Sequence, residues 1–87
     1  ALVNRGSYGE VKRMFVDTAR RGLGTGTKLL EYLEMFARMS GIRALKLETG
    51  IHQPEAIRLY ERAGFVRCEP FGDYQPDPLS LFMEKAL

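Results

Sequence analysis

Residues 21–27 read Arg-Gly-Leu-Gly-Thr-Gly-Thr, a glycine-rich turn that leads from a predicted strand into a predicted helix. Glycines at alternate positions let the backbone turn tightly and bring its N–H groups close to an anion, and a helix N-terminus adds the positive end of its dipole. The stretch therefore predicts a phosphate cradle. A bare glycine cluster is more often a connecting turn with positive φ angles, so the neighbouring segments have to decide between the two.

The segments on either side of this turn form a strand, a helix and a strand. Residues 10–16 alternate, with neither face wholly polar, which is typical of a strand in the middle of a sheet. Residues 27–40 predict an amphipathic helix that ends at Gly41, and residues 44–49 predict the next strand. Strand, crossover helix and strand in this order predict a βαβ unit with parallel strands. The apolar face of the helix comprises Leu29, Leu30, Leu33, Phe36 and Ala37.

The remaining segments complete an α/β fold with a mixed central sheet. A β-hairpin is predicted at the start of the chain, from residues 1–3 to the strand that follows Gly9. Pro54 suits the first position of a second helix, which Gly64 ends. Short strands are expected at residues 65–68 and 81–85. The apolar face of the second helix comprises Ala56, Ile57, Tyr60 and Ala63.

Length and composition restrict the class of protein. At 87 residues the chain is at most one small domain, and its own core is expected to be marginal. Thirteen basic and eleven acidic residues give a net charge of +2, which is too weak to indicate a nucleic-acid partner. The single cysteine, Cys68, cannot form an internal disulfide, is expected to be buried and inert, and fits a cytoplasmic protein. We expect no metal, because no Cys/His cluster has ligand spacing, and no membrane partner, because no apolar run approaches ~18 residues.

Two common nucleotide motifs do not fit the glycine-rich turn. A Walker A loop ends in Gly-Lys-Ser/Thr, whereas this chain has Thr27-Lys28-Leu29. A dinucleotide-binding fingerprint that starts at Gly22 requires a third glycine at position 27, where Thr27 stands. Any phosphate ligand must therefore belong to another class.

The motifs resemble those of the GNAT superfamily of acyl-CoA N-acyltransferases along most of the chain. Residues 21–26 match the family signature Arg/Gln-x-x-Gly-x-Gly/Ala, and residues 12–16 are similar to the strand that precedes it. Residues 53–65, QPEAIRLYERAGF, are similar to the family segment Asn-x-x-Ala-x-x-Leu-Tyr-x-x-x-Gly-Phe. The resemblance implies direct transfer of the acetyl group of acetyl-CoA to a primary amine of a small molecule or peptide in a ternary complex. A noncatalytic coenzyme-A-binding or interaction module is the alternative.

The resemblance also implies how the chain would hold acetyl-CoA. Arg21 is expected near the phosphates, and Gln53, which replaces the family's usual asparagine, would reach a pantetheine carbonyl. The backbone of Met14, Phe15 and Val16 would pair with the pantetheine arm. The backbone N–H groups that would bind the pyrophosphate belong to Gly22, Leu23, Gly24, Thr25, Gly26 and Thr27.

Two side chains receive catalytic roles from the resemblance. Tyr60 would donate a proton to the departing thiolate, although a packed core tyrosine explains the same position. Glu10 would act as general base through water, and a merely solvated edge glutamate is the alternative. His52 is a further candidate base. Phe71 and Tyr74, in the loop before the last strand, would line the acceptor site.

The chain corresponds to the second half of the family's domain, so we interpret residues 1–87 as a single partial domain that carries the coenzyme-A-binding half. We expect either a longer intact protein or a partner chain that pairs with the edge strand around residues 2–3. A homodimer is the predicted oligomeric state.

Overall fold

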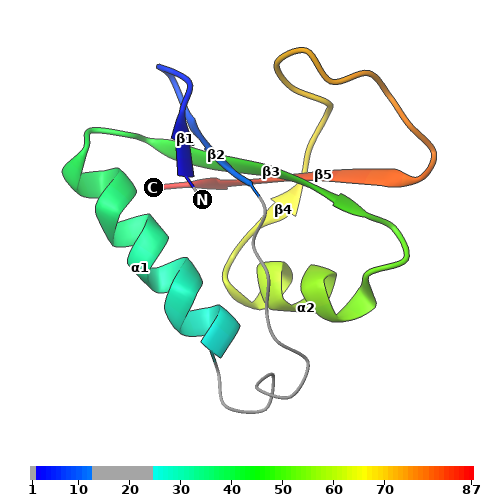
Figure 1. Ribbon diagram of the computed structural model, residues 1–87, viewed down its shortest axis with the longest axis horizontal. Coiled ribbons are helices and arrows are strands. Elements are labelled where there is room, and N and C mark those ends of the chain that lie inside the picture. Colours follow the sequence, from blue (N-terminus) through cyan, green and yellow to red (C-terminus); the bar gives the residue numbers. More distant parts are fainter. Residues whose placement is uncertain (1, 13–24) are drawn as a thin grey trace.

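The computed structural model describes residues 2–12 and 25–87, which form a five-stranded mixed sheet and two helices (Figure 1). The strand order is β1-β2-β3-β5-β4. The predicted α/β class and mixed central sheet are therefore confirmed. In chain order the elements are β1 (Leu2–Asn4), β2 (Gly9–Val11), α1 (Thr25–Met39), β3 (Ala44–Gly50), α2 (Pro54–Arg62), β4 (Val66–Arg67) and β5 (Ser80–Ala86).

Some predicted positions lie outside the described residues. These are the second half of the strand predicted over residues 10–16 and the first part of the glycine-rich turn. The predicted site residues concerned are Met14, Phe15, Val16, Arg21, Gly22, Leu23 and Gly24.

The predicted parallel strand pair is confirmed and lies at the centre of the sheet. β2 and β3 pair in parallel through Gly9↔Leu45, Glu10↔Lys46 and Val11↔Leu47, with α1 between them in sequence. β1 pairs antiparallel with β2, which confirms the predicted hairpin and makes β1 an edge strand. β3 continues beyond Leu47 to Gly50 and pairs antiparallel with β5 along its whole length. Among the described residues, the parallel ladder therefore ends before β3 does.

Both helices lie on one face of the sheet (Figure 1). The alternation of the strands points Val11, Leu45, Leu47 and Met83 to that face, where they join the apolar sides of α1 and α2. From the helices and the turns that follow them come Leu30, Leu33, Ala37, Ile42, Tyr60 and Phe65. This cluster is the hydrophobic core, and it anchors the crossover helix beneath the parallel strands.

The two helices end as the sequence predicts. Gly41 has φ +80° and Gly64 has φ +102°, a region that favours glycine. The N–H of Ile42 donates to the carbonyl of Ala37 at 2.9 Å, and the N–H of Phe65 donates to that of Tyr60 at 3.0 Å. These hydrogen bonds, which span five residues, are those of a Schellman turn, and they satisfy carbonyls at each helix end.

The prediction for the apolar face of α1 is wrong at Phe36. Its side chain is 52% exposed, whereas Leu30, Leu33 and Ala37 are buried. At about 100° per residue, Phe36 lies about 90° from the centre of the stripe that those three residues form, so it falls outside the contact with the sheet. The exposed apolar side of α1 comprises Tyr32, Met35, Phe36 and Met39.

The opposite face of the sheet carries aromatic residues from the segment between β4 and β5. Phe71 is buried and packs edge-to-face against Tyr74 and Phe82, with ring centroids 5.2 and 5.8 Å apart. Tyr8, in the β1–β2 turn, packs edge-to-face on Phe71 at 5.5 Å. The ammonium of Lys46 lies 5.1 Å from the centroid of the Tyr8 ring. We call Tyr8, Phe71, Tyr74 and Phe82 the aromatic cluster.

Candidate functional site

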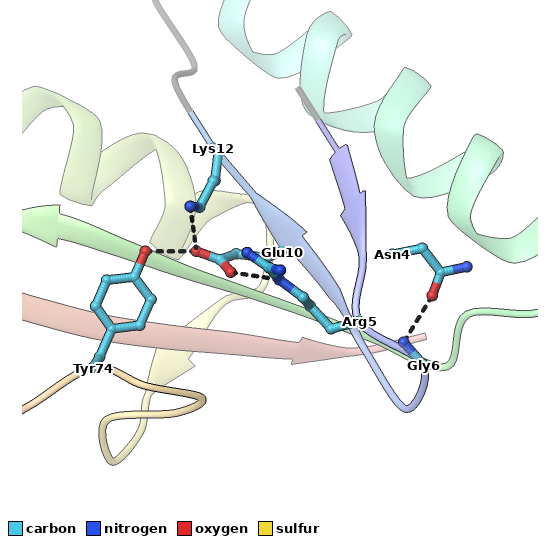
Figure 2. A network of polar contacts seen from close by, with 6 residues as sticks. All are labelled: Asn4, Arg5, Gly6, Glu10, Lys12 and Tyr74. Atoms are coloured by element: carbon cyan, nitrogen blue, oxygen red, sulfur yellow. Dashed lines mark hydrogen bonds and ion pairs between the residues drawn. The ribbon is translucent and has the colours of Figure 1, made fainter.

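The β1–β2 turn positions the first charged residues of the site. The side-chain oxygen of Asn4 accepts a hydrogen bond of 2.8 Å from the N–H of Gly6, as in an Asx turn, and the N–H of Arg5 donates to the carbonyl of Tyr8 at 2.9 Å. This short connection returns the chain along β2. Arg5 is thereby placed beside the side chain of Glu10 (Figure 2).

Glu10 is a buried carboxylate on the face of the sheet opposite the helices. Glu10 is 3% exposed. Among residues 2–12 and 25–87, no other charged residue is buried. Arg5 Nε lies 3.2 Å from Oε1, while the Tyr74 hydroxyl donates to Oε2 at 2.6 Å (Figure 2). Lys12 Nζ lies 3.9 Å from Oε2. The alternative of a solvated edge glutamate is therefore wrong, because β2 is an inner strand and a buried carboxylate needs such partners.

Tyr74 titrates unusually because of this contact. Its hydrogen bond to Glu10 raises the pKa of the Tyr74 phenol from its ordinary value of 10.0 to about 12, with burial and the Glu10 charge adding to the effect. The phenol therefore remains a hydrogen-bond donor throughout the neutral and moderately alkaline range. Phe71 and Phe82 both pack edge-to-face against the Tyr74 ring, with centroids 5.2 and 5.5 Å away.

The raised pKa links the stability of the fold to alkaline pH. Because the folded pKa of Tyr74 is higher than the unfolded one, the contact contributes fully below about pH 10 and is lost as pH rises towards 12. We expect the free energy of unfolding of Tyr74→Phe to fall less between pH 10 and 12 than that of the parent protein. Urea unfolding at stepped pH measures the difference. Parallel pH profiles for the two proteins would contradict the contact.

Tyr60 lies in α2 on the other face, within the hydrophobic core. It is 7% exposed, its ring packs edge-to-face on Phe65 with centroids 5.9 Å apart, and burial raises the pKa of its phenol. The prediction that it faces the core is confirmed. Its phenol is protonated at neutral pH, as a proton donor must be.

Within residues 2–12 and 25–87, the last pair of the parallel ladder is Val11 and Leu47, which belong to the same core cluster as Tyr60. Glu10 precedes Val11 and points to the opposite face, because successive side chains of a strand alternate. At this pair, the Glu10 carboxylate and the core cluster that contains Tyr60 therefore lie on opposite faces of the sheet.

The first turn of α1 contains the last three residues of the predicted cradle. The helix begins at Thr25 rather than Thr27, so Thr25, Gly26 and Thr27 are helical. N–H groups in a first turn have no partner within the helix, and the helix dipole is positive there. No acidic residue lies in this turn. These three positions were predicted to lie in a loop but belong to a helix N-terminus, which can bind an anion equally well.

The start of α2 carries the other predicted polar residues. Gln53 is the residue before the helix, its side chain is exposed, and it makes no capping hydrogen bond to α2. His52 is exposed in the turn before Gln53. Within residues 2–12 and 25–87, the side chains that bind the Glu10 carboxylate are those of Arg5, Lys12 and Tyr74, so neither His52 nor Gln53 is among them.

A shallow hollow of about 540 Å³ lies on the sheet face that carries Glu10. Its lining residues are Lys46, Arg67, Cys68, Glu69, Pro70 and Glu84. Cys68 is half-buried rather than buried, and burial together with the Glu84 charge raises the pKa of its thiol. Its position at the margin of the short strand β4 leaves one side uncovered. The prediction that Cys68 is buried is therefore wrong, while its inertness stays a prediction that the raised pKa favours, because a protonated thiol is a poor nucleophile.

Two classes of feature are missing from the described ranges. Among residues 2–12 and 25–87, no group of three acidic, cysteine or histidine side chains is arranged to bind a metal ion. Neither α1 nor α2, the helices in that part of the chain, is long and apolar enough to cross a bilayer.

The contact between Glu10 and Tyr74 is a feature that the sequence did not predict. The two residues are 64 positions apart, so no local spacing relates them. The signal that was present is the glutamate itself: once residues 10–16 are placed inside a sheet, its carboxylate requires a cation or a donor. Arg5, across the hairpin, was the partner that this reasoning could have found.

Comparison with known proteins places the chain in a family. Residues 1–65 match the model of the acetyltransferase (GNAT) family. A protein of Azospirillum brasilense named IAA acetyltransferase is 55% identical over 87 residues, which are 100% of this chain and 57% of that protein. An acyl-CoA N-acyltransferase structure from Klebsiella pneumoniae superposes with a TM-score of 0.92 at 49% identity, over 98% of this chain and 59% of that one.

A more distant structure shares the fold. A streptothricin acetyltransferase structure from Bacillus anthracis, solved in complex with acetyl coenzyme A, has a TM-score of 0.79 at 22% identity, over 97% of this chain and 51% of that one. The chain thus spans somewhat more than half the length of the relatives it matches. The family match, which includes the glycine-rich turn and reaches Phe65, shows that the chain belongs to the GNAT acetyltransferase family.

Proposed function

We propose that the protein transfers the acetyl group of acetyl-CoA directly to a primary amine of a small molecule or peptide. The observation that carries this proposal is the arrangement about the last parallel pair, Val11 and Leu47. Tyr60 belongs to the same core cluster as that pair on one face of the sheet, and the carboxylate of Glu10, the residue before Val11, lies on the other face. A thioester placed between the ends of β2 and β3 would have an acid on one side and a base on the other.

Glu10 is proposed to remove the first proton. A primary ammonium has a pKa near ~10 and cannot attack until it loses a proton. A carboxylate oxygen can accept two hydrogen bonds, so Oε1, which Arg5 contacts, can still accept one from a water molecule, whereas Oε2 already has the Tyr74 hydroxyl and the nearby Lys12 ammonium. The proton passes through that water to Glu10 and then to solvent. The freed nitrogen attacks the thioester carbonyl, and a C–N bond forms.

Tyr60 is proposed to complete the reaction at the sulfur. As the C–S bond breaks, the phenol donates its proton to the leaving thiolate. The nitrogen loses its second proton as the amide forms, and a water-mediated transfer of an equivalent proton returns Tyr60 to its starting state. The products are the acetylated amine, coenzyme A with a free thiol, and one proton released to solvent. Burial supports this role because it keeps the phenol protonated.

The binding of acetyl-CoA is proposed to use the N-terminus of α1. The pyrophosphate would accept hydrogen bonds from backbone N–H groups in Gly22 to Thr27, with Arg21 nearby. Met14, Phe15 and Val16 would pair with the pantetheine arm, and the exposed amide of Gln53 would reach one of its carbonyls. Acetyl-CoA, when bound, supplies the activated acyl group, and no metal takes part in the proposed chemistry.

A charge placed in the first turn of α1 tests the anion site. Thr27→Asp should raise the Kd for acetyl-CoA by roughly tenfold, because a carboxylate there repels the pyrophosphate. It should leave the unliganded protein equally or slightly more stable, since an acidic residue favours a helix N-terminus. Titration calorimetry and thermal unfolding measure the two effects. Thr27→Asn, of the same size but uncharged, is the matched control and should keep the parent affinity; equal affinity in Thr27→Asp would contradict the site.

The proposed activity is separable from a noncatalytic coenzyme-A-binding module. The protein is mixed with acetyl-CoA and a panel of primary amines, and free thiol is followed together with acetylated product. An enzyme releases one thiol per acetylated amine. Acetyl-CoA that binds and raises the melting temperature, yet acetylates no amine of a broad panel, would favour the binding module.

A further inference from the structure

The segment between β4 and β5 contributes a hydroxyl to the carboxylate that the proposed function uses as its base. Tyr74 donates a hydrogen bond of 2.6 Å to Glu10 Oε2, from a position 64 residues further along the chain (Figure 2). At this length the bond is in the range of a charge-assisted O–H···O⁻ hydrogen bond. Arg5 holds the other oxygen at 3.2 Å. The carboxylate is therefore oriented from both ends.

The Tyr74 ring is itself held in place by packing. Phe71 and Phe82 contact it edge-to-face, with centroids 5.2 and 5.5 Å away, and Phe71 is buried against Tyr8. The N–H of Tyr74 donates to the carbonyl of Phe71 at 3.1 Å, which closes a turn at this point. The aromatic cluster thus presents the hydroxyl from a pre-formed platform rather than from a loose side chain.

We propose that Tyr74 is a positioning residue, which orients the Glu10 carboxylate for proton removal from the acceptor amine. The inference rests on the proposed role of Glu10 as base. The phenol donates to Oε2 and leaves the second lone pair of Oε1, the oxygen that Arg5 contacts, for water. It is also a neutral hydrogen-bond donor to the buried carboxylate, in addition to the cationic partners Arg5 and Lys12. The raised pKa of the Tyr74 phenol, about 12, keeps that donor in place at any pH at which the enzyme would work.

Tyr74→Phe removes the hydroxyl and keeps the ring. We expect kcat for acetyl transfer to fall about tenfold, the loss of one hydrogen bond to a charged group, while the KM for the amine changes less than about twofold. Tyr8→Phe removes a hydroxyl from the same aromatic cluster and should leave kcat and KM unchanged.

The coupling to Glu10 is measured by a double-mutant cycle. In a Glu10→Gln background, Tyr74→Phe should have no further effect on kcat, because the base that it orients is gone. A tenfold fall that persists in that background, or a raised KM with unchanged kcat, would mean that Tyr74 contacts the acceptor directly and would overturn the inference while the proposed reaction stands. Normal activity in Glu10→Gln would instead show that Glu10 is not the base.

A titration tests the contact without any activity. The phenolate absorbance of Tyr74, taken as the difference between the parent protein and Tyr74→Phe, should titrate near pH 12. In Glu10→Gln the same difference should move towards the ordinary pKa of 10.0. An unmoved titration would overturn the contact. A shifted titration in a protein that acetylates no amine would mean that the contact exists and the proposed function fails.

Discussion

Tyr60→Phe should lower kcat for acetyl transfer by about 100-fold and leave the Kd for acetyl-CoA within about twofold. The substitution removes one oxygen atom from a residue whose ring lies in the hydrophobic core, so the packing against Phe65 remains. The thiolate then leaves without a proton donor, and general acid catalysis of this kind is worth about 10²- to 10⁴-fold. Steady-state thiol release measures kcat, and titration calorimetry measures binding.

Tyr32→Phe is the matched control for this substitution. Tyr32 lies on α1, is 60% exposed and belongs to the exposed apolar side of that helix. Its loss of a hydroxyl should leave kcat unchanged. If Tyr60→Phe also keeps the parent kcat, Tyr60 is a packed core tyrosine without a chemical role, and the acid of the reaction has to be another group or water.

Leu45→Ala should lower the free energy of unfolding by about 3 kcal/mol. Leu45 is 0% exposed and lies in β3, the strand between β2 and β5, where its side chain meets the core from the middle of the sheet. Truncation removes buried methyl groups and leaves a cavity that flanking strands cannot close. Since the free energy of unfolding of a domain of this size is only a few kcal/mol, much of the variant protein should be unfolded at 37 °C.

Leu79→Ala provides the comparison. The same atoms are removed from a residue that is 60% exposed, just before β5, and the expected change is within about 0.5 kcal/mol. Urea unfolding followed by circular dichroism gives both values. Similar losses for the two variants would mean that the cluster on the helix side of the sheet is not the main core.

The fold could be predicted because its signals are local. The alternation of residues 44–49, the Pro54 start of α2 and the glycines that end both helices are each set by a few neighbouring residues. The parallel pairing of β2 and β3 follows from one crossover helix between two strands. The prediction failed at Phe36, where an apolar residue with nearly the right spacing lies beside the contact with the sheet rather than within it.

The candidate site was only partly predictable for a physical reason. Glu10 and Tyr60 were found through motif and strand position, which are properties of short stretches. The partners of Glu10 come from the hairpin and from the segment before β5. The Tyr74 hydroxyl comes to 2.6 Å from the carboxylate only once all strands of the sheet are assembled. The strand of Glu10 was predicted inside the sheet, but a solvated Glu10 stayed open, because the periodicity of a strand does not show what covers its carboxylate.

The proposed reaction is tested most directly by the position of the thioester in a structure of the protein with acetyl-CoA. The pyrophosphate should lie at the first turn of α1, and the acetyl carbonyl should lie beyond Val11 and Leu47, the last described parallel pair. The Tyr60 hydroxyl should lie within hydrogen-bond distance of the sulfur, and a water molecule should bridge Glu10 to the acceptor side of the carbonyl. A thioester bound away from the ends of β2 and β3, or with its sulfur out of reach of Tyr60, would contradict it.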